Sequence, residues 1–223
     1  LLCKRTGGWF TELKLYDMKT DPGQRLNVAV VYPEQYKKMR ALYEEWFDDV
    51  FSDYKTRSYI QIGTEEASEM VLSSHDWMEV VKPDGTRAAK PGGEDTPPFA
   101  HSIIRRGKLL NGYWDVEIMS AGEYEIKLMR WPEEAGRAIR EGIPASTTPI
   151  PGGKPFGEGK ALDIDNARLE IQGFENSMTV TDEMKSAPFI VDLEKGKTKL
   201  KTWFTGKDDL SLGAYYVYIS KAE

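Results

Sequence analysis

From Tyr59 onward, apolar and polar residues alternate one by one in a series of short segments. This period of two is typical of a β-strand with one buried and one solvated face, because successive side chains point to opposite sides of a sheet. Turn residues, as at 195–197 and 206–209, separate the segments, which are 114–118, 124–128, 167–171, 189–193, 200–204 and 215–219. The pattern therefore predicts a mainly β fold, an antiparallel β-sandwich of the jelly-roll kind.

Two of these segments also predict a local pairing. Ala121-Gly122 is a turn signal between residues 114–118 and 124–128, so we expect these two segments to form a hairpin with one solvated face. Trp114 falls on the apolar side of its segment, which predicts a position in the core.

The first fifty residues follow a different pattern. Residues 13–18 alternate like a strand and stop at a turn signal, Asp21-Pro22-Gly23. Pro33 opens a helix, and an apolar stripe follows at spacings of three and four, formed by Tyr36, Met39, Tyr43, Trp46 and Val50. One strand and one helix cannot bury this stripe, so it needs a partner surface. We expect residues 1–55 to form this short strand–helix segment and residues 56–223 to form the sandwich domain.

Composition excludes several classes of function. The 223 residues carry 30 Lys plus Arg against 36 Asp plus Glu, a formal net charge of −6. A nucleic-acid surface needs clustered Lys and Arg, so this balance argues against one. No apolar run reaches the roughly 18 residues of a membrane-spanning helix. The single cysteine, Cys3, removes every multi-cysteine zinc site. Two stretches dense in Pro and Gly, 82–98 and 142–159, are predicted to be loops.

Motifs of catalysis are incomplete in this sequence. Gly152 to Lys160 lacks the Gly-Lys-Ser/Thr ending of a phosphate-binding loop. Asp163-Ile164-Asp165 begins like a calcium loop but lacks the next ligand and the glycine. Ser74-His75-Asp76 places three triad residue types in a row, but neighbours on an extended chain point apart and cannot converge. We therefore expect neither a catalytic residue nor a metal ligand in this chain.

A longer motif carries a family resemblance. Leu15-Tyr16-Asp17-Met18-Lys19-Thr20-Asp21-Pro22-Gly23-Gln24, followed by Asn27-Val28-Ala29 and Tyr32-Pro33-Glu34, resembles the closing segment of type I sulfatases, the arylsulfatase family. In that family such a stretch ends a small C-terminal sheet and leads into the last helix. The segments 60–63, 75–77, 112–116, 121–124, 130–132 and 213–217 look like the β-rich extension of some bacterial arylsulfatases. The resemblance implies that residues 1–55 end a sulfatase subdomain and that residues 56–223 are an accessory domain.

The resemblance implies a parent enzyme that hydrolyses sulfate esters with a formylglycine and a calcium ion. Sulfatases make the formylglycine from Cys or Ser in a C/S-x-P/A-x-R motif, whereas Cys3 is followed by Arg5 and Gly7 at the Pro/Ala and Arg positions. We therefore expect this chain, taken as a piece of a longer protein, to lack both groups and to be inactive alone. Its implied partner is the N-terminal sulfatase catalytic domain of the same chain, whose fold it would complete and whose substrate cleft it would border. The implied location is periplasmic or secreted.

A carbohydrate-binding module is the alternative function. Six Trp and eleven Tyr supply rings that can stack on a sugar. The Gly112-Tyr113-Trp114 segment, followed by residues 121–124, also resembles sugar-binding jelly rolls. A sulfated carbohydrate is the ligand that the sulfatase resemblance suggests. A hydrolase that works through Asp and Glu alone is a third possibility, for which the sequence offers no distinguishing feature.

Four side chains are the candidate substrate-binding residues: Arg130, Trp131, Trp203 and His75. Trp203 falls on the polar side of its strand, and Trp131 stands at a strand end next to Arg130. Both rings are therefore candidates for the surface, but ordinary packing is favoured over ligand stacking by about two to one for each.

Overall fold

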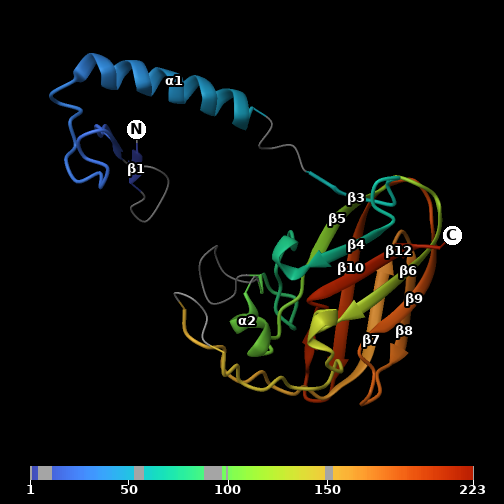
Figure 1. Cartoon of the computed structure of the whole chain (residues 1–223). Coiled ribbons are helices and arrows are strands. Elements are labelled where there is room, and N and C mark those ends of the chain that lie inside the picture. The colour runs from blue at the N-terminus through green and yellow to red at the C-terminus, as the bar shows by residue number, and fades with distance from the viewer. Residues whose placement is uncertain are drawn as a thin grey trace. The chain divides into compact units, whose positions relative to one another are not determined.

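The computed structural model describes residues 2–4, 12–52, 58–87, 97–98, 100–148 and 153–222. The chain divides into two compact units, Leu1–Arg57 and Ser58–Glu223, whose elements are labelled along the chain in Figure 1. No helix within the described ranges is long and apolar enough to cross a membrane.

Within its described residues, the first unit holds two short paired strands and one long helix. β1 (Leu2–Lys4) runs antiparallel to β2 (Glu12–Lys14), and α1 spans Pro33–Phe51. The predicted helix is confirmed, and a proline at its first position needs no N–H partner there. Trp46 and Val50 of the apolar stripe are 54% and 52% exposed.

The predicted strand over residues 13–18 is wrong beyond Lys14. The cause is Asp17, whose carboxylate accepts hydrogen bonds from the backbone N–H of Lys19 at 3.0 Å and from the hydroxyl of Thr20 at 2.8 Å. A short polar side chain that bonds the backbone two residues onward stabilises a turn in place of a strand.

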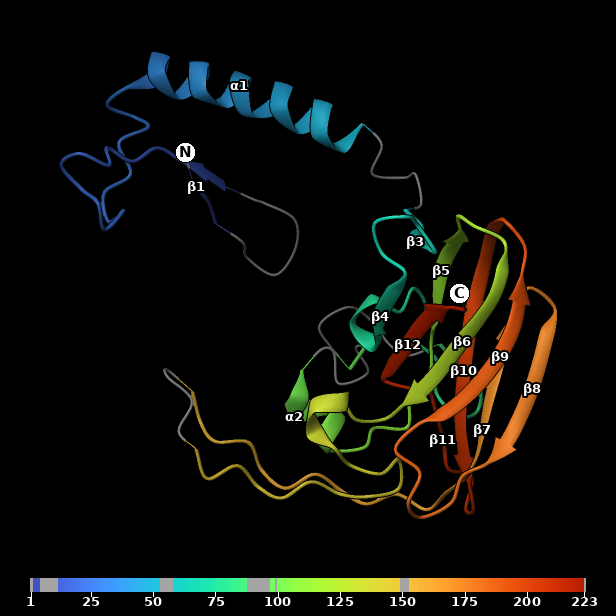
Figure 2. The same ribbon diagram turned by 45° about the vertical axis from the view of Figure 1, so that its right-hand side comes forward.

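The second unit is a β-sandwich of two sheets, which Figures 1 and 2 show as two facing layers. Its strands are β3 (Ile60–Ile62), β4 (Glu69–Ser73), β5 (Tyr113–Ile118), β6 (Gly122–Met129), β7 (Ile164–Ile171), β8 (Phe174–Thr179), β9 (Ala187–Leu193), β10 (Gly196–Gly206), β11 (Ser211–Leu212) and β12 (Tyr216–Lys221). The larger sheet has the order β3-β5-β10-β7-β8, with β11 beside β10, and the smaller sheet has the order β4-β12-β6-β9. All pairs except β3 with β5 are antiparallel. The predicted mainly β, antiparallel sandwich is confirmed.

The predicted hairpin across Ala121-Gly122 is wrong. β5 belongs to the larger sheet and β6 to the smaller one, so this turn crosses between the layers. Both strands bury their apolar side chains in the same core, one from each sheet. The alternation of side chains shows which face of a strand is buried, but it does not show which strand lies beside it. A hairpin does join β7 to β8 through Gln172 and Gly173, whose φ angles of 48° and 80° suit the tight turns of hairpins.

The core lies between the two sheets and contains Trp114, as predicted, with none of its surface exposed. Its indole N–H donates to the carbonyl of Ser73 at 2.8 Å. Trp77 packs edge-on against it, with 5.9 Å between the ring centroids. Gly112 makes room for Trp77, because a Cβ at that position would lie 2.6 Å from the Cγ of the indole. These contacts tie the two layers together.

Short helices and long connections complete the sandwich. The helices are η1 (Ser74–Asp76), α2 (His101–Arg105) and η2 (Glu133–Ala135). Residues 88–96 of the loop predicted over 82–98, and residues 149–152 of the loop predicted over 142–159, lie outside the described residues.

The described part of the second loop is held at its base by one side chain. Arg105 is 8% exposed, and its guanidinium donates to the carbonyls of Pro144 at 2.9 Å and Gly157 at 2.8 Å. Ile143 and Gly159 also form an isolated antiparallel bridge. The two legs of the loop are therefore fixed to the sandwich and to each other.

Candidate functional site

Arg130, a candidate substrate-binding residue, is completely buried at the end of β6. Its guanidinium donates to the backbone carbonyls of Ile139 at 3.3 Å and Glu141 at 3.2 Å, and to that of Lys160. Burial lowers the pKa of Arg130 to about 10, so the group still carries its charge at neutral pH. The side chain binds three loop carbonyls, and no part of it reaches the surface.

Trp131 is 1% exposed, so its ring is packed, which is the favoured explanation, and its placement as a surface ring that binds substrate is wrong. The guanidinium of Arg130 lies 4.6 Å from the centre of the ring, and the indole N–H donates to the carbonyl of Glu141 at 2.9 Å. The chain at Gly159 lies against the ring, where an added Cβ would come within 2.9 Å of it. Loops distant in sequence cover this strand end, which local alternation does not reveal.

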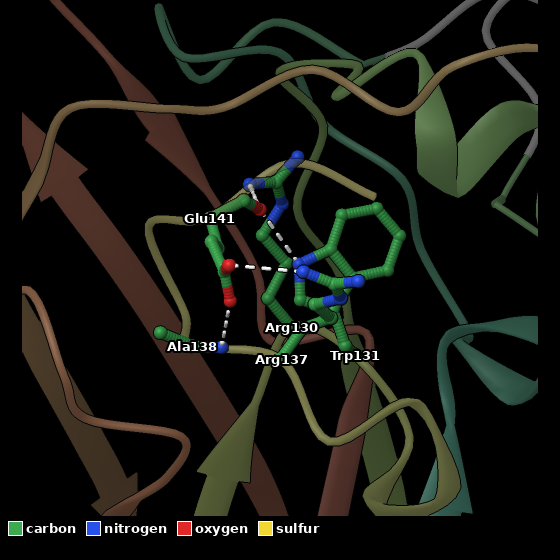
Figure 3. Close-up of polar contacts among 5 residues, drawn as sticks. All are labelled: Arg130, Trp131, Arg137, Ala138 and Glu141. Atoms are coloured by element: carbon green, nitrogen blue, oxygen red, sulfur yellow. Dashed lines mark hydrogen bonds and ion pairs between the residues drawn. The ribbon is translucent and has the colours of Figure 1, made fainter. Parts of the chain in front are cut away.

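Figure 3 shows how Glu141 completes this arrangement. Its carboxylate accepts the backbone N–H of Ala138 at 3.0 Å and pairs with Arg137 at 3.0 Å. The hydrogen bond from Ala138, followed by that from Arg137, lowers the pKa of Glu141. The residues of Figure 3 therefore hold the loop that follows β6 against the end of that strand.

His75, another candidate, is exposed in η1, directly after β4 of the smaller sheet. Trp203 lies on β10 of the larger sheet. The four candidate residues therefore come from three separate places, and the structure does not gather them into one site.

Trp203 is the candidate with a partly exposed ring on the outer face of the larger sheet. On β10 the buried side chains are Leu200, Thr202 and Phe204, so Trp203 points outward as predicted. Arg168 is its direct neighbour on β7, with the guanidinium carbon 4.2 Å from the centre of the ring. The outer face of the larger sheet thus carries an aromatic ring at its centre.

Two more rings lie on this face. Tyr113 on β5 is opposite Lys201 of β10, and the ammonium of Lys199 lies 4.0 Å from the centre of its ring. Tyr59 directly precedes β3, and the ammonium of Lys197 lies 4.6 Å from the centre of its ring. Both tyrosines are half-buried. Each of the three rings is therefore covered by one cationic side chain.

The strand register places the three rings on one line. Tyr59 lies one residue before the Ile60–Val116 pair, so it is level with position 115 of β5, two residues from Tyr113. Tyr113 pairs with Lys201 of β10, and Trp203 lies two residues beyond Lys201. Each step crosses one strand and advances two residues, a diagonal of about 8 Å between Cβ atoms. We call Tyr59, Tyr113 and Trp203 the aromatic diagonal; it crosses β3, β5 and β10, which lie side by side in Figure 2.

Charged groups with fixed partners border the diagonal at Trp203. Arg168 pairs with Glu175 at 2.9 Å, and Glu170 accepts a hydrogen bond from the ammonium of Lys201 at 2.7 Å. These side chains come from three adjacent strands, so the pairs run across the sheet. The face offers both donors and acceptors beside a line of rings, in an arrangement set by the rigid sheet.

The sequence pattern indicated Trp203 as a candidate but did not indicate the two tyrosines beside it. The alternation around Trp114 would place Tyr113 on the outer face, but Tyr59 stands outside any predicted strand. Their common line depends on the register between strands distant in sequence. Within the described ranges, no group of three or more His, Cys, Asp or Glu side chains could hold a metal ion.

Comparison with known proteins gives matches among solved structures only. No family model matches the sequence, and no curated protein does. Among solved structures, a CBM35 module of Cellvibrio japonicus Abf62 has 16% identity and a TM-score of 0.36, covering 70% of this chain and 94% of that one. A family 35 carbohydrate binding module from Clostridium thermocellum has 15% identity and a TM-score of 0.35, covering 70% and 100%.

A ruminal GH26 endo-beta-1,4-mannanase has 11% identity and a TM-score of 0.31, and the match covers 75% of this chain and 27% of that one. Likeness at this level carries no argument about what this chain binds. The function has to follow from its own residues.

Proposed function

We propose that the second unit binds carbohydrate on the outer face of its larger sheet, with the aromatic diagonal as the platform. The observation that supports this most is the position of the three rings, Tyr59, Tyr113 and Trp203, which point to one side at even steps across adjacent strands. Large aromatic side chains are costly to leave at a surface, so three in line favour a binding role.

The chemistry of the face suits a sugar. The C–H faces of a pyranose ring are apolar and stack on aromatic rings, while its hydroxyl groups both donate and accept hydrogen bonds. Arg168 and Lys201 supply donors beside Trp203, and Glu170 and Glu175 supply acceptors. Because these groups already hold one another in place, little side-chain entropy is lost when a ligand binds.

The cations over the rings do not block this role. Arg168 lies against the Trp203 ring, which stays partly exposed, so a sugar can contact the part of the ring that Arg168 leaves accessible. Lys197 and Lys199 are exposed, and a cation–π contact at an exposed site is worth only about 0.5–1 kcal/mol. Long lysine side chains can move to the rim at that cost and offer their ammonium groups to hydroxyl, carboxylate or sulfate oxygens. A sulfated carbohydrate therefore remains one of the ligands to test.

Binding can be measured by isothermal titration calorimetry with a mannan, a xylan, an alginate and a carrageenan. We expect at least one to bind, and Trp203→Ala to weaken that binding by about 1–3 kcal/mol, or about fivefold to 150-fold in Kd, through lost stacking and burial. Trp46→Ala, which removes an exposed tryptophan of α1, is the matched control and should leave Kd unchanged.

The result that would refute the proposal is binding that survives both Trp203→Ala and Tyr113→Ala in folded protein. Tyr218 lies on the outer face of the smaller sheet, where a groove of about 370 Å³ lies beside it. Loss of binding in Tyr218→Ala alone would place the site there. Absence of binding to every polymer tested would also reject the proposal.

We propose separately that the chain comes from the C-terminal end of a sulfatase. The motif over residues 15–34 is what motivates this proposal. Within it, the Asn27 side chain accepts the N–H of Leu15 at 3.1 Å, and the N–H of Val28 donates to the carbonyl of Leu15 at 2.8 Å. The test is the genomic sequence upstream of Leu1, where a C/S-x-P/A-x-R motif is expected and its absence would reject the parentage.

A further inference from the structure

We infer that the aromatic diagonal binds an internal stretch of an extended polysaccharide rather than the end of a chain. This inference rests on the proposed function and adds the form of the ligand. Its basis is that the line continues beyond the three rings: Asn166 on β7 pairs with Thr205, one diagonal step past Trp203. The line thus runs from the edge strand β3 to the fourth strand of the sheet, three steps or about 24 Å.

A ligand has to be extended to use all of this line. The four positions lie on adjacent strands of one sheet face, so an occupant that touches all of them is a straight chain several sugar units long. Asn166 is half-buried and carries an amide that can both donate to and accept from a hydroxyl. The line therefore offers an amide at the Asn166 end and aromatic rings at its other three positions, and both kinds of group can contact the sugar units of a polysaccharide.

The ends of the aromatic diagonal also favour binding of the internal sugar units of a polysaccharide over binding of its terminal sugar. Recognition of a chain end needs groups that enclose the terminal sugar and satisfy its extra hydroxyl, since leaving buried polar groups unpaired is costly. Here Tyr59 stands at the edge strand of the sheet, and beyond Asn166 the next strand is β8, whose outward residues Glu175, Ser177 and Thr179 are exposed. Within the described residues of the second unit, a ligand chain can therefore pass over the site at both ends.

This geometry makes affinity depend on ligand length. Each ring acts separately, so every additional ring that the ligand covers should lower Kd roughly threefold to tenfold. Affinity should rise from a disaccharide to an oligosaccharide that spans the line and should then stay constant. Reducing the terminal sugar to an alditol should not change it.

The experiment is a calorimetric titration of the full chain with oligosaccharides of two, four, six and eight units from the polymer that it binds. Tyr59→Ala removes the ring at one end, so it should abolish the gain of the longest oligomers and leave the disaccharide unaffected. Tyr113→Ala removes the central ring and should weaken the longer oligomers more. Trp46→Ala is again the control, and circular dichroism shows whether each variant is folded.

The possible results distinguish failure of the internal-chain inference from failure of the proposed function. Equal affinity for the disaccharide and the octasaccharide, or loss of binding when the terminal sugar is reduced, would overturn the internal-chain inference while leaving carbohydrate binding intact. Tyr59→Ala variants that keep the full length dependence would also overturn it. Failure to bind any polymer or oligomer would overturn the proposed function and this inference together.

Discussion

Arg130→Met removes the buried guanidinium while keeping most of the volume of the side chain, and so tests whether this residue binds ligand or holds the fold. The guanidinium donates to the carbonyls of Ile139, Glu141 and Lys160. Hydrogen bonds from a charged donor are worth about 1.5–3 kcal/mol each, so the three together contribute about 4–9 kcal/mol. Methionine leaves all three carbonyls without this donor.

Part of that loss is offset, because the buried charge itself is costly. The fall in the pKa of Arg130 from 12.5 to about 10 corresponds to about 3 kcal/mol against the charged form. The difference predicts that Arg130→Met lowers the free energy of unfolding by roughly 1–6 kcal/mol, with about 3 kcal/mol as the central value. That is a large share of the stability of an ordinary domain.

The assay is equilibrium urea unfolding at pH 7, followed by tryptophan fluorescence. Arg137→Met is the matched control, since the Arg137–Glu141 pair is partly exposed, with side chains 35% and 49% accessible, and its loss should cost less than about 1 kcal/mol. A loss for Arg130→Met below about 1 kcal/mol, or no greater than that of the control, would refute the structural role. Loss of carbohydrate binding in a variant whose stability is unchanged would instead assign Arg130 to the ligand.

Two further predictions concern stability. Gly206→Ala should cost at least about 3 kcal/mol in urea unfolding, because its Cβ would lie 1.9 Å from the backbone oxygen of Asp163, whereas Gly157→Ala has open space and should stay within about 0.5 kcal/mol; equal effects would contradict this packing. Burial, and then the charge of Arg105, lower the pKa of His101. The unfolded chain therefore binds the proton first, and stability should fall as pH drops through about 6.5, the ordinary pKa of histidine. His101→Gln should flatten this fall between pH 8 and 6, and an unchanged profile would count against it.

The alternation of single side chains was sufficient to predict which face is buried in each of the six segments that it identified as strands. Trp114 in the core and Trp203 on the outer face follow from it, and so does the sandwich itself. The helix α1 also follows from local signals, a proline start and a stripe of period 3.6. These are properties of short segments, since a side chain's direction depends on its own strand or helix.

The contacts between segments that are distant in sequence could not be predicted in the same way. The turn at Ala121-Gly122 links two sheets rather than two paired strands, because alternation is the same in both cases. Trp131 is covered by the chain at Gly159 and by Glu141, which belong to a loop after its strand. Burial at a strand end depends on where such loops return, and no local pattern carries that information.

The sequence by itself determined that this chain makes a β-sandwich and that it carries tryptophan and tyrosine on outward positions. Only the tertiary structure decided which of those rings belong together. Tyr59, Tyr113 and Trp203 are far apart in the chain and share a line because β3, β5 and β10 pair in one register. Register is fixed by the burial of whole strands against a common core, so a site built across strands appears only when the sheet has formed.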